Sequence, residues 1–203
     1  MSGYPILLEG GSLAALLVGG GRAAVRHAGA LLAAGAEVRV VAPWIDPALR
    51  GLPQEPGRLV LVERRYARDD IGDALLVIAT TDDRRVDAAV AADAHAARRL
   101  VFVADVPGEG TCLPVAAHRT GDLLVAVSAA GLPAVASRVR DAIGGRFDER
   151  YAEAVEALAT LRERLLTEGR RDDWERALNS LVTREFCDVV EHGAFPNRVA
   201  AWR

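Results

Sequence analysis

A run of glycines near the amino terminus is the first group of residues whose types and spacing could bind a ligand. The run fits the pattern G-x-G-x-x-[GA], in which the first glycine permits a tight turn and the second lets the backbone approach a pyrophosphate. The helix that follows would offer its unpaired N–H groups to the phosphates. The pattern predicts a dinucleotide site, and the alternative is a tight turn without a ligand. The residues concerned are Gly19, Gly20, Gly21, Arg22, Ala23 and Ala24.

The acidic residue that commonly binds the adenosine ribose in such a site is missing. It would lie at the end of the second strand, where the sequence reads VVAPW over residues 40–44. Arg22 and Arg39 could meet a 2′-phosphate, although a solvated surface position explains each of them more simply. The side chains therefore do not decide between NAD and NADP.

Polar residues directly follow a later apolar run, at a place where open α/β folds bind ligands. They are Thr80, Thr81, Asp82 and Asp83. An aspartate in front of a helix is also a good N-cap. Capping and cofactor contact are both open for this segment, and the two can hold together.

Asp105 follows another apolar run, residues 100–104, and would lie at the same edge of a sheet. A carboxylate beside an apolar strand end can have its pKa raised and act as a general base. Ser128 precedes a loop of small residues, 129–133, which could receive an anionic group or be an ordinary turn. Asp105 and Ser128 are therefore candidates for chemistry and for substrate binding respectively.

Several kinds of chemistry are not indicated. The four histidines lack metal-ligand spacing, so we expect no permanent metal site. Of the four, only His118 is retained as a candidate functional residue. Cys112 and Cys187 lie far apart, which favours two buried or half-buried thiols over a disulfide framework. The chain contains no lysine, which excludes a Schiff base on the protein.

The elements that must position these residues alternate between strand and helix. Short apolar runs predict buried strands, and helical spacing after the glycines predicts a helix that ends near Gly35. This alternation is typical of a Rossmann-type, doubly wound parallel sheet in the α/β class. The predicted strands are 13–18, 37–42, 59–63, 74–79, 100–104 and 123–127, and the predicted later helices are 84–97 and 133–143.

The character of the sequence changes after Gly144 and Gly145, which form a natural hinge. Apolar residues from Tyr151 to Phe186 then follow helical spacing only, so a small helical region completes the chain. We expect an NAD-binding domain over 1–112, a dimerisation and substrate segment over 113–145, and a helical C-terminal domain over 146–203.

Composition limits the partners. The chain has 203 residues, a formal net charge of −3 and a pI near 5.8, which gives no basic field for nucleic acid or an anionic membrane. No stretch approaches the roughly 20 apolar residues of a membrane helix, and the amino terminus lacks the pattern of a secretory signal. We therefore expect a cytoplasmic protein that binds neither nucleic acid nor membrane.

In these features the chain resembles the precorrin-2 dehydrogenase and sirohydrochlorin ferrochelatase domain of sirohaem synthases, in its stand-alone form. The resemblance covers roughly residues 4–145, in order and at near-family spacing. It rests on YPI at 4–6, LVGGG at 17–21 with Ala24 and Arg26, AGA at 34–36, VVAP at 40–43, Arg65 with Tyr66, VIATTDD at 77–83, VADVP at 103–107, Leu113 with Pro114, GDL at 121–123, and Val127 with Ser128.

The resemblance implies a function. In that family a hydride passes from precorrin-2 to NAD, giving sirohydrochlorin, and some members also insert iron. Asp105 matches the proposed general base. The positions matching the NAD contacts include Gly21, Arg22, Ala23 and the turn of Pro43 and Trp44; with Gly19, Gly20, Thr80, Thr81 and Asp82 they form the predicted cofactor site.

The family also implies homodimers, and a substrate with eight carboxylates that arginines can bind. Ser128, Arg119 and Arg138 are the candidate substrate residues, with Arg26 and Arg140 as further candidates, although a solvated position is the simpler account of any single arginine. Fe²⁺ or Co²⁺ would enter only as a substrate metal.

Three departures from the family fall around the substrate pocket. Phe102 and Val103 stand where the family usually has an Asn, and the stretches 105–114 and 128–133 are each one residue short. Two alternatives therefore stay open beside the NAD-dependent dehydrogenase. One is a relative recruited to another substrate or acting mainly as a chelatase, and the other is a non-catalytic NAD-sensing module.

Overall fold

The computed structural model describes residues 3–53, 55–104 and 106–202. The chain divides into two compact units, Met1–Pro114 and Val115–Arg203. Each unit has its own hydrophobic core. None of the helices in the described part of the chain combines the length and the apolar character that crossing a membrane requires.

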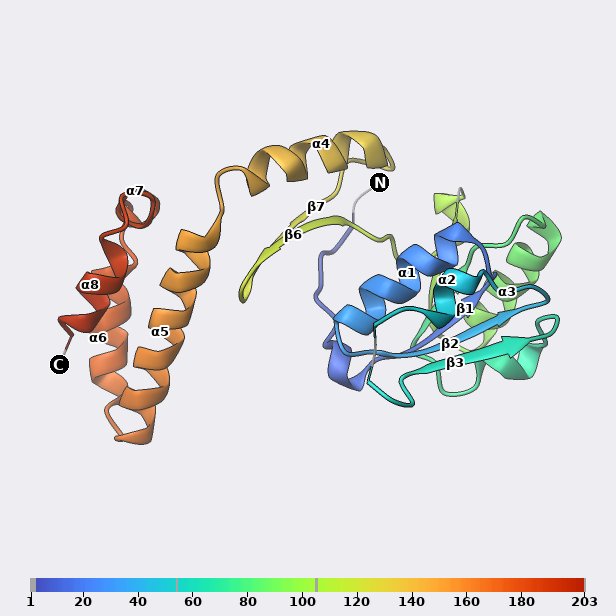
Figure 1. The fold of residues 1–203 in the computed structure, drawn as a ribbon, viewed down its shortest axis with the longest axis horizontal. Coiled ribbons are helices and arrows are strands. Elements are labelled where there is room, and N and C mark those ends of the chain that lie inside the picture. Colours follow the sequence, from blue (N-terminus) through green and yellow to red (C-terminus); the bar gives the residue numbers. More distant parts are fainter. Residues whose placement is uncertain (1–2, 54, 105, 203) are drawn as a thin grey trace. The chain divides into compact units, whose positions relative to one another are not determined.

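The first unit is built on a five-stranded sheet with the order β3-β2-β1-β4-β5, in which every neighbouring pair is parallel (Figure 1). The strand order reverses beside β1, since the chain moves outward to β2 and β3 and then returns to β4 on the other side. Open α/β sheets bind ligands at this point, beyond the carboxyl ends of the strands. The strands are β1 (Ala14–Val18), β2 (Glu37–Ala42), β3 (Leu59–Glu63), β4 (Leu76–Ala79) and β5 (Leu100–Val103).

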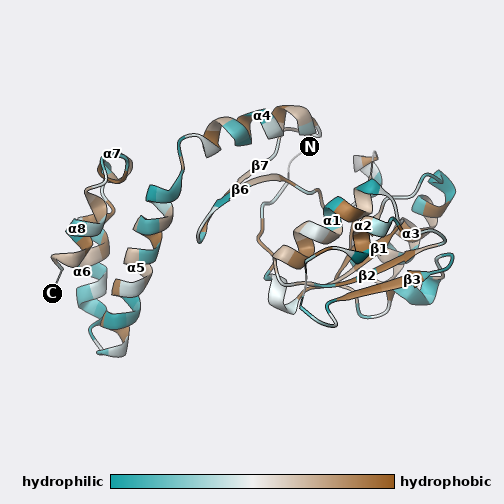
Figure 2. Ribbon diagram, in the orientation of Figure 1, coloured by the Kyte–Doolittle hydropathy of each residue, from teal (hydrophilic) through white to brown (hydrophobic). Residues whose placement is uncertain are grey.

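Helices cover both faces of this sheet. Ala24, Ala28 and Leu32 of α1 pack in one core cluster with Leu17, while Leu16 of the same strand packs in a second cluster that includes α3. Apolar residues of β1 are therefore buried on both faces of the sheet, and Figure 2 shows hydrophobic colour along the strands. The helices of this unit are α1 (Arg22–Ala33), α2 (Pro47–Arg50) and α3 (Arg84–Ala96), with 3-10 turns η1 (Gly10–Ser12), η2 (Arg68–Ile71) and η3 (Pro107–Glu109).

The second unit begins with an antiparallel hairpin of β6 (Ala116–Thr120) and β7 (Leu123–Val127). Helix α4 packs on the hairpin, and the remaining helices enclose a core around Tyr151, Leu165 and Phe195. Leu123 of the hairpin packs against this core as well. The helices are α4 (Pro133–Gly144), α5 (Glu149–Thr167), α6 (Arg171–Leu181), α7 (Phe186–Glu191) and α8 (Phe195–Ala200).

The predicted α/β class, with its Rossmann-type parallel sheet and helical C-terminal region, is confirmed. The strand predicted over 123–127 forms, but it pairs with β6 outside the parallel sheet. Strand β6 was not predicted, because its sequence AAHRT lacks the apolar run that marks a buried strand. The three-part division stays a prediction as to the roles of its parts, while the hairpin and α4 cluster with the C-terminal helices.

Candidate functional site

The glycine loop, Gly19–Gly21, joins β1 to α1 at the carboxyl edge of the sheet. Gly19 has a φ of +122°, and a Cβ there would collide with the carbonyl oxygen of Thr80. A Cβ on Gly20 would collide with the carbonyl oxygen of Trp44. The first two glycines are therefore required by the packing of the loop against the segments that follow β4 and β2.

Gly21 differs from its neighbours. Its φ of −88° suits any residue, and a Cβ on it would meet no described atom within 4 Å. Packing within the described residues therefore does not demand a glycine here. Because Gly21 has no side chain, there is open space directly beside the amino end of α1.

The amino end of α1 suits an anion. Gly21 is the N-cap, no described side chain caps the helix, and its first turn holds no acidic residue. The loop itself is held by backbone hydrogen bonds, from Gly19 N to Val41 O (3.0 Å) and from Asp46 N to Gly20 O (2.8 Å). A fixed loop with open space and free N–H groups fits the pyrophosphate of a dinucleotide.

Pro43 and Trp44 follow β2 at the same edge. The Trp44 side chain is 62% exposed although its backbone packs on Gly20. An exposed indole beside the glycine loop offers an aromatic face to a ligand.

Arg39 is not directed at the glycine loop. It lies in the middle of β2, and its guanidinium lies near Gly72, towards the opposite edge of the sheet.

The threonine loop, Thr80–Asp83, connects β4 to α3. Thr80 N donates to Val18 O (2.9 Å), which ties the start of the loop to β1. Asp83 caps α3 by accepting from Arg85 N (2.9 Å), and this bond lowers the pKa of its carboxyl. The predicted capping role is therefore confirmed for Asp83, while Asp82 is exposed at the same edge.

A buried carboxylate that the sequence did not reveal lies behind this loop. Asp87 of α3 is 2% exposed and accepts from both Thr81 N (3.1 Å) and Thr81 Oγ1 (2.8 Å). The Thr81 hydroxyl also accepts from Asp83 N (3.2 Å). Because Thr81 is engaged inside the protein, Thr80 and Asp82 remain the members of this loop best placed for a ligand. The only signal in the sequence is an aspartate in the first turn of a predicted helix. Such a residue is normally explained by its favourable interaction with the helix dipole.

Asp105, the candidate general base, lies outside the described residues. Before it, Ala104 N donates to Ala79 O (2.9 Å), and further along the chain Thr111 N donates to Val101 O (2.8 Å). Glu109 in η3 pairs with Arg84 of α3 (2.7 Å) and accepts from His95 Nε2 through its carbonyl oxygen (3.1 Å). The segment after Asp105 is thereby tied to the helix that begins at the threonine loop.

The candidate substrate residues belong to the second unit. Arg119 lies near the turn of the hairpin and Ser128 beyond its other end, roughly 13 Å of strand away. Arg119 is exposed on the face opposite His118, whose ring lies beside Gly144 of α4, so Arg119 points away from that helix. Arg138 is exposed on α4 itself. These three assignments stay predictions.

The other residues singled out from the sequence have structural roles. His118 Nε2 donates to Phe147 O (2.6 Å), which joins β6 to the segment before α5. Cys112 and Cys187 are both half-buried free thiols, as expected, and burial raises the pKa of Cys112. Among the described residues no group of three or more His, Cys, Asp or Glu could hold a metal ion.

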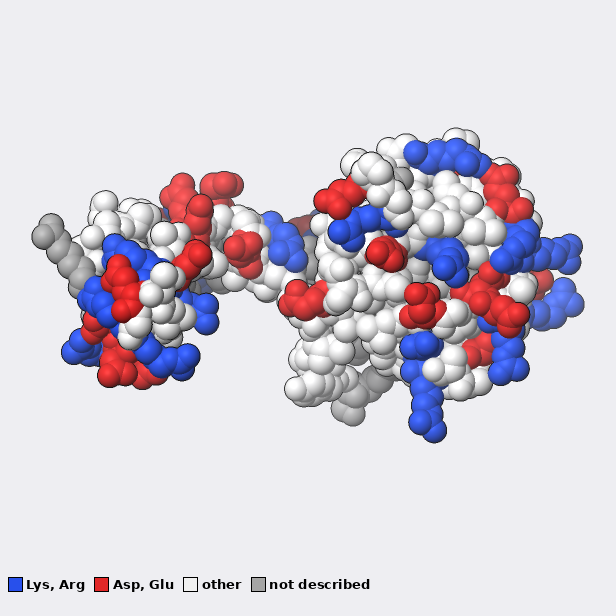
Figure 3. All heavy atoms as spheres, turned by 90° about the horizontal axis from the view of Figure 1, so that it is seen from below, with Lys and Arg blue, Asp and Glu red and all other residues white. Residues whose placement is uncertain are grey.

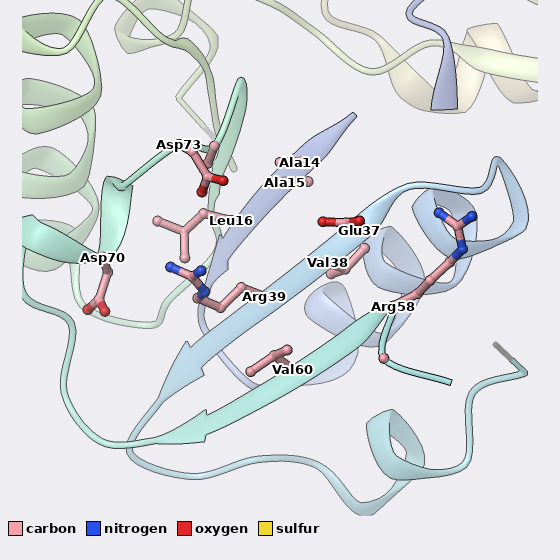
Figure 4. Close-up of a pocket in the computed structure, with 12 residues that line it drawn as sticks. Ala14, Ala15, Leu16, Glu37, Val38, Arg39, Arg58, Val60, Asp70 and Asp73 are labelled. Carbon is pink, nitrogen blue, oxygen red and sulfur yellow. The ribbon is translucent and has the colours of Figure 1, made fainter. Parts of the chain in front are cut away.

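A small cavity of about 80 Å³ lies at the amino ends of β1 and β2, opposite the glycine loop (Figure 4). Its charged lining residues are three acids and two bases, which largely offset one another: Glu37, Asp70, Asp73, Arg39 and Arg58. Figure 3 likewise shows cationic and acidic side chains interspersed on the face that it draws. Neither feature competes with the glycine loop as the ligand site.

The comparisons with known proteins agree with this geometry. The model of a family described as "Putative NAD(P)-binding" matches residues 6–116. Siroheme synthase of Pseudomonas entomophila is 38% identical over 181 residues, which are 86% of this chain and 38% of the relative. Siroheme synthase of Chromobacterium violaceum is 35% identical over 199 residues, 95% of this chain and 41% of the relative. The chain thus spans about two fifths of the length of these relatives.

A solved structure of "SirC, precorrin-2 dehydrogenase" has the same fold, with a TM-score of 0.74, 21% identity, and coverage of 97% of this chain and 98% of that one. The resemblance found in the sequence is confirmed by these relatives. Residues 6–116 are more than half of the chain and include the glycine loop, Trp44 and the threonine loop. The chain belongs to the NAD(P)-binding family whose model it matches.

Proposed function

We propose that this chain is an NAD-dependent dehydrogenase that oxidises precorrin-2 to sirohydrochlorin in sirohaem biosynthesis. The observation that carries the proposal is the open space at Gly21, beside the uncapped amino end of α1 and between the segments that follow β2 and β4. The identity to sirohaem synthases over most of this chain, and the fold shared with a precorrin-2 dehydrogenase, support the choice of substrate.

Different residues of the site pack the loop and bind the cofactor. Gly19 and Gly20 let the loop pack closely, while Gly21 and the amino end of α1 bind the pyrophosphate. Trp44, Pro43 and the exposed part of the threonine loop flank the cofactor. The acidic residue that would bind the adenosine ribose at the end of β2 is missing, since the sequence there reads VVAPW over residues 40–44.

The reaction removes a hydride and a proton from the substrate. NAD, when bound beside the glycine loop, would supply the acceptor for that hydride. Asp105 takes the proton in this proposal, because it follows an apolar strand at the edge where ligands bind. Ser128, Arg119 and Arg138 are assigned to the carboxylates of the tetrapyrrole, for which arginine is the best-suited side chain.

We further propose a homodimer in which α4 meets its counterpart. The N-cap residue Leu132 and the helical residues Val135 and Val139 form an apolar stripe along α4 and are 59%, 49% and 43% exposed. Apolar residues at such helical spacing usually pack against another surface. A cytoplasmic location, testable by cell fractionation, completes the proposal.

An anaerobic assay of the purified protein with precorrin-2 and NAD tests the reaction, by following NADH formation and the sirohydrochlorin spectrum. We expect turnover that requires NAD. Asp105→Asn should abolish turnover and leave NAD binding intact, because the amide cannot accept the proton. Binding of NAD without turnover would contradict the proposal and favour another substrate or a sensor. Consumption of sirohydrochlorin and Fe²⁺ or Co²⁺ without NAD would indicate a chelatase.

A further inference from the structure

The strongest unassigned feature of the described residues is the buried carboxylate of Asp87. It is one of only two charged residues among them that are almost fully buried, and it is 2% exposed. The other, Asp70, is paired with Arg64. Asp87 instead receives the N–H and the hydroxyl of Thr81, at 3.1 and 2.8 Å. Burying a carboxylate is costly, so its retention here requires these bonds or a functional role.

The bonds from Thr81 determine where the threonine loop lies. Thr80 precedes Thr81 and is the residue on which Gly19 packs so closely that a Cβ would overlap the Thr80 carbonyl oxygen. Thr81 in turn accepts from Asp83 N, the cap of α3. One carboxylate therefore connects the amino end of α3 to the loop that faces the glycine loop.

We propose that Asp87 is a positioning residue of the cofactor site. It acts through Thr81, holding the threonine loop against the glycine loop so that Thr80 and Asp82 face the dinucleotide. This inference rests on the proposed cofactor site and adds a residue to it. Asp87 does not touch the cofactor in this account, because its side chain is buried and accepts its hydrogen bonds from Thr81.

Three variants separate positioning from general stability. Asp87→Ala removes both acceptors and frees the N–H and hydroxyl of Thr81. Asp87→Asn keeps an oxygen that can accept both bonds but removes the charge. Val90→Ala is the matched control, because Val90 is fully buried in the same helix, one turn further on, and has no hydrogen bond to the loop.

The measurements are the NADH dissociation constant, the melting temperature, and hydrogen exchange of the Thr81 amide in the full chain without cofactor. We expect Asp87→Ala to weaken NADH binding about tenfold and to speed exchange of the Thr81 amide. Asp87→Asn should stay within about twofold of the wild type in affinity. Val90→Ala should lower the melting temperature but change neither the affinity nor the Thr81 exchange.

Two outcomes would overturn the inference. One is an Asp87→Ala protein that loses no more NADH affinity than Val90→Ala does at a comparable loss of melting temperature. The other is an Asp87→Asn protein as weak as Asp87→Ala, because the charge and not the acceptor would then matter. A wild-type protein that does not bind NADH overturns the proposed function instead, and exchange of the Thr81 amide still decides whether Asp87 holds the loop.

Discussion

The carbonyl oxygen of Trp44 occupies the place where a Cβ on Gly20 would lie. The segment after β2 is therefore packed directly on the glycine loop, and Asp46 N holds it there through Gly20 O at 2.8 Å. One residue further on, Gly21 faces open space. Adjacent glycines thus serve different purposes, the first in packing and the second in leaving room for a ligand.

Substitutions of these two glycines should affect different properties, stability for Gly20 and cofactor binding for Gly21. Gly20→Ala should lower the free energy of unfolding by about 1–3 kcal/mol, because its methyl group overlaps the Trp44 backbone. Gly21→Ala should cost less than about 1 kcal/mol as a change of N-cap, yet weaken NADH binding about tenfold by filling the space beside α1. Urea denaturation and calorimetric titration measure the two quantities. Equal affinity of Gly21→Ala and wild type would contradict the assignment of this space to the cofactor.

Trp44 should report cofactor binding by fluorescence. It is the only tryptophan of the first unit and is 62% exposed, whereas Trp174 and Trp202 pack against the core of the second unit. We expect NADH to quench the emission of Trp44 by energy transfer, because the reduced nicotinamide absorbs where indole emits. Trp44→Phe should lose most of the quenching while keeping an aromatic face for the ligand. Full quenching in that variant would place the cofactor elsewhere, and Trp174→Phe is the control.

The sheet and the glycine loop could be predicted from the sequence because buried parallel strands form short apolar runs and the glycines stand between such a run and a helix. The hairpin strand β6 could not, since alanine, histidine and arginine carry no strand signal until β7 pairs with them. Asp87 could not either, because its bonds to Thr81 depend on the turn between β4 and α3. The same turn shows that Thr81, predicted as a cofactor contact, is engaged with Asp87.

Stability at acid pH should depend on Asp70. Its carboxylate accepts from Arg64 at 2.7 and 2.5 Å and from Ala67 N at 2.8 Å, and the bonds from Arg64 are the main cause of its lowered pKa. Because the unfolded chain then takes up the proton first, this contribution is full above the unfolded pKa of about 3.9 and is lost as the pH falls through the lower folded value.

Asp70→Asn should therefore be less stable than wild type at pH 7, and the difference should shrink below about pH 4. Urea denaturation across this range measures it. Asp69→Asn is the control for the loss of one surface carboxylate, since Asp69 is exposed beside Asp70. A difference that stays constant with pH would show that the ionised carboxylate of Asp70 contributes nothing.

The apolar stripe of α4 should determine the oligomeric state. Val135→Glu places a charge in the middle of the stripe formed with Leu132 and Val139, where a partner helix would have to desolvate it. Ala134→Glu is the control, because Ala134 is exposed on the same helix but points away from the stripe. Sedimentation velocity should show a dimer for wild type and Ala134→Glu, and a monomer for Val135→Glu. A monomeric wild type, or a Val135→Glu dimer as stable as wild type, would mean that this face is not the contact between subunits.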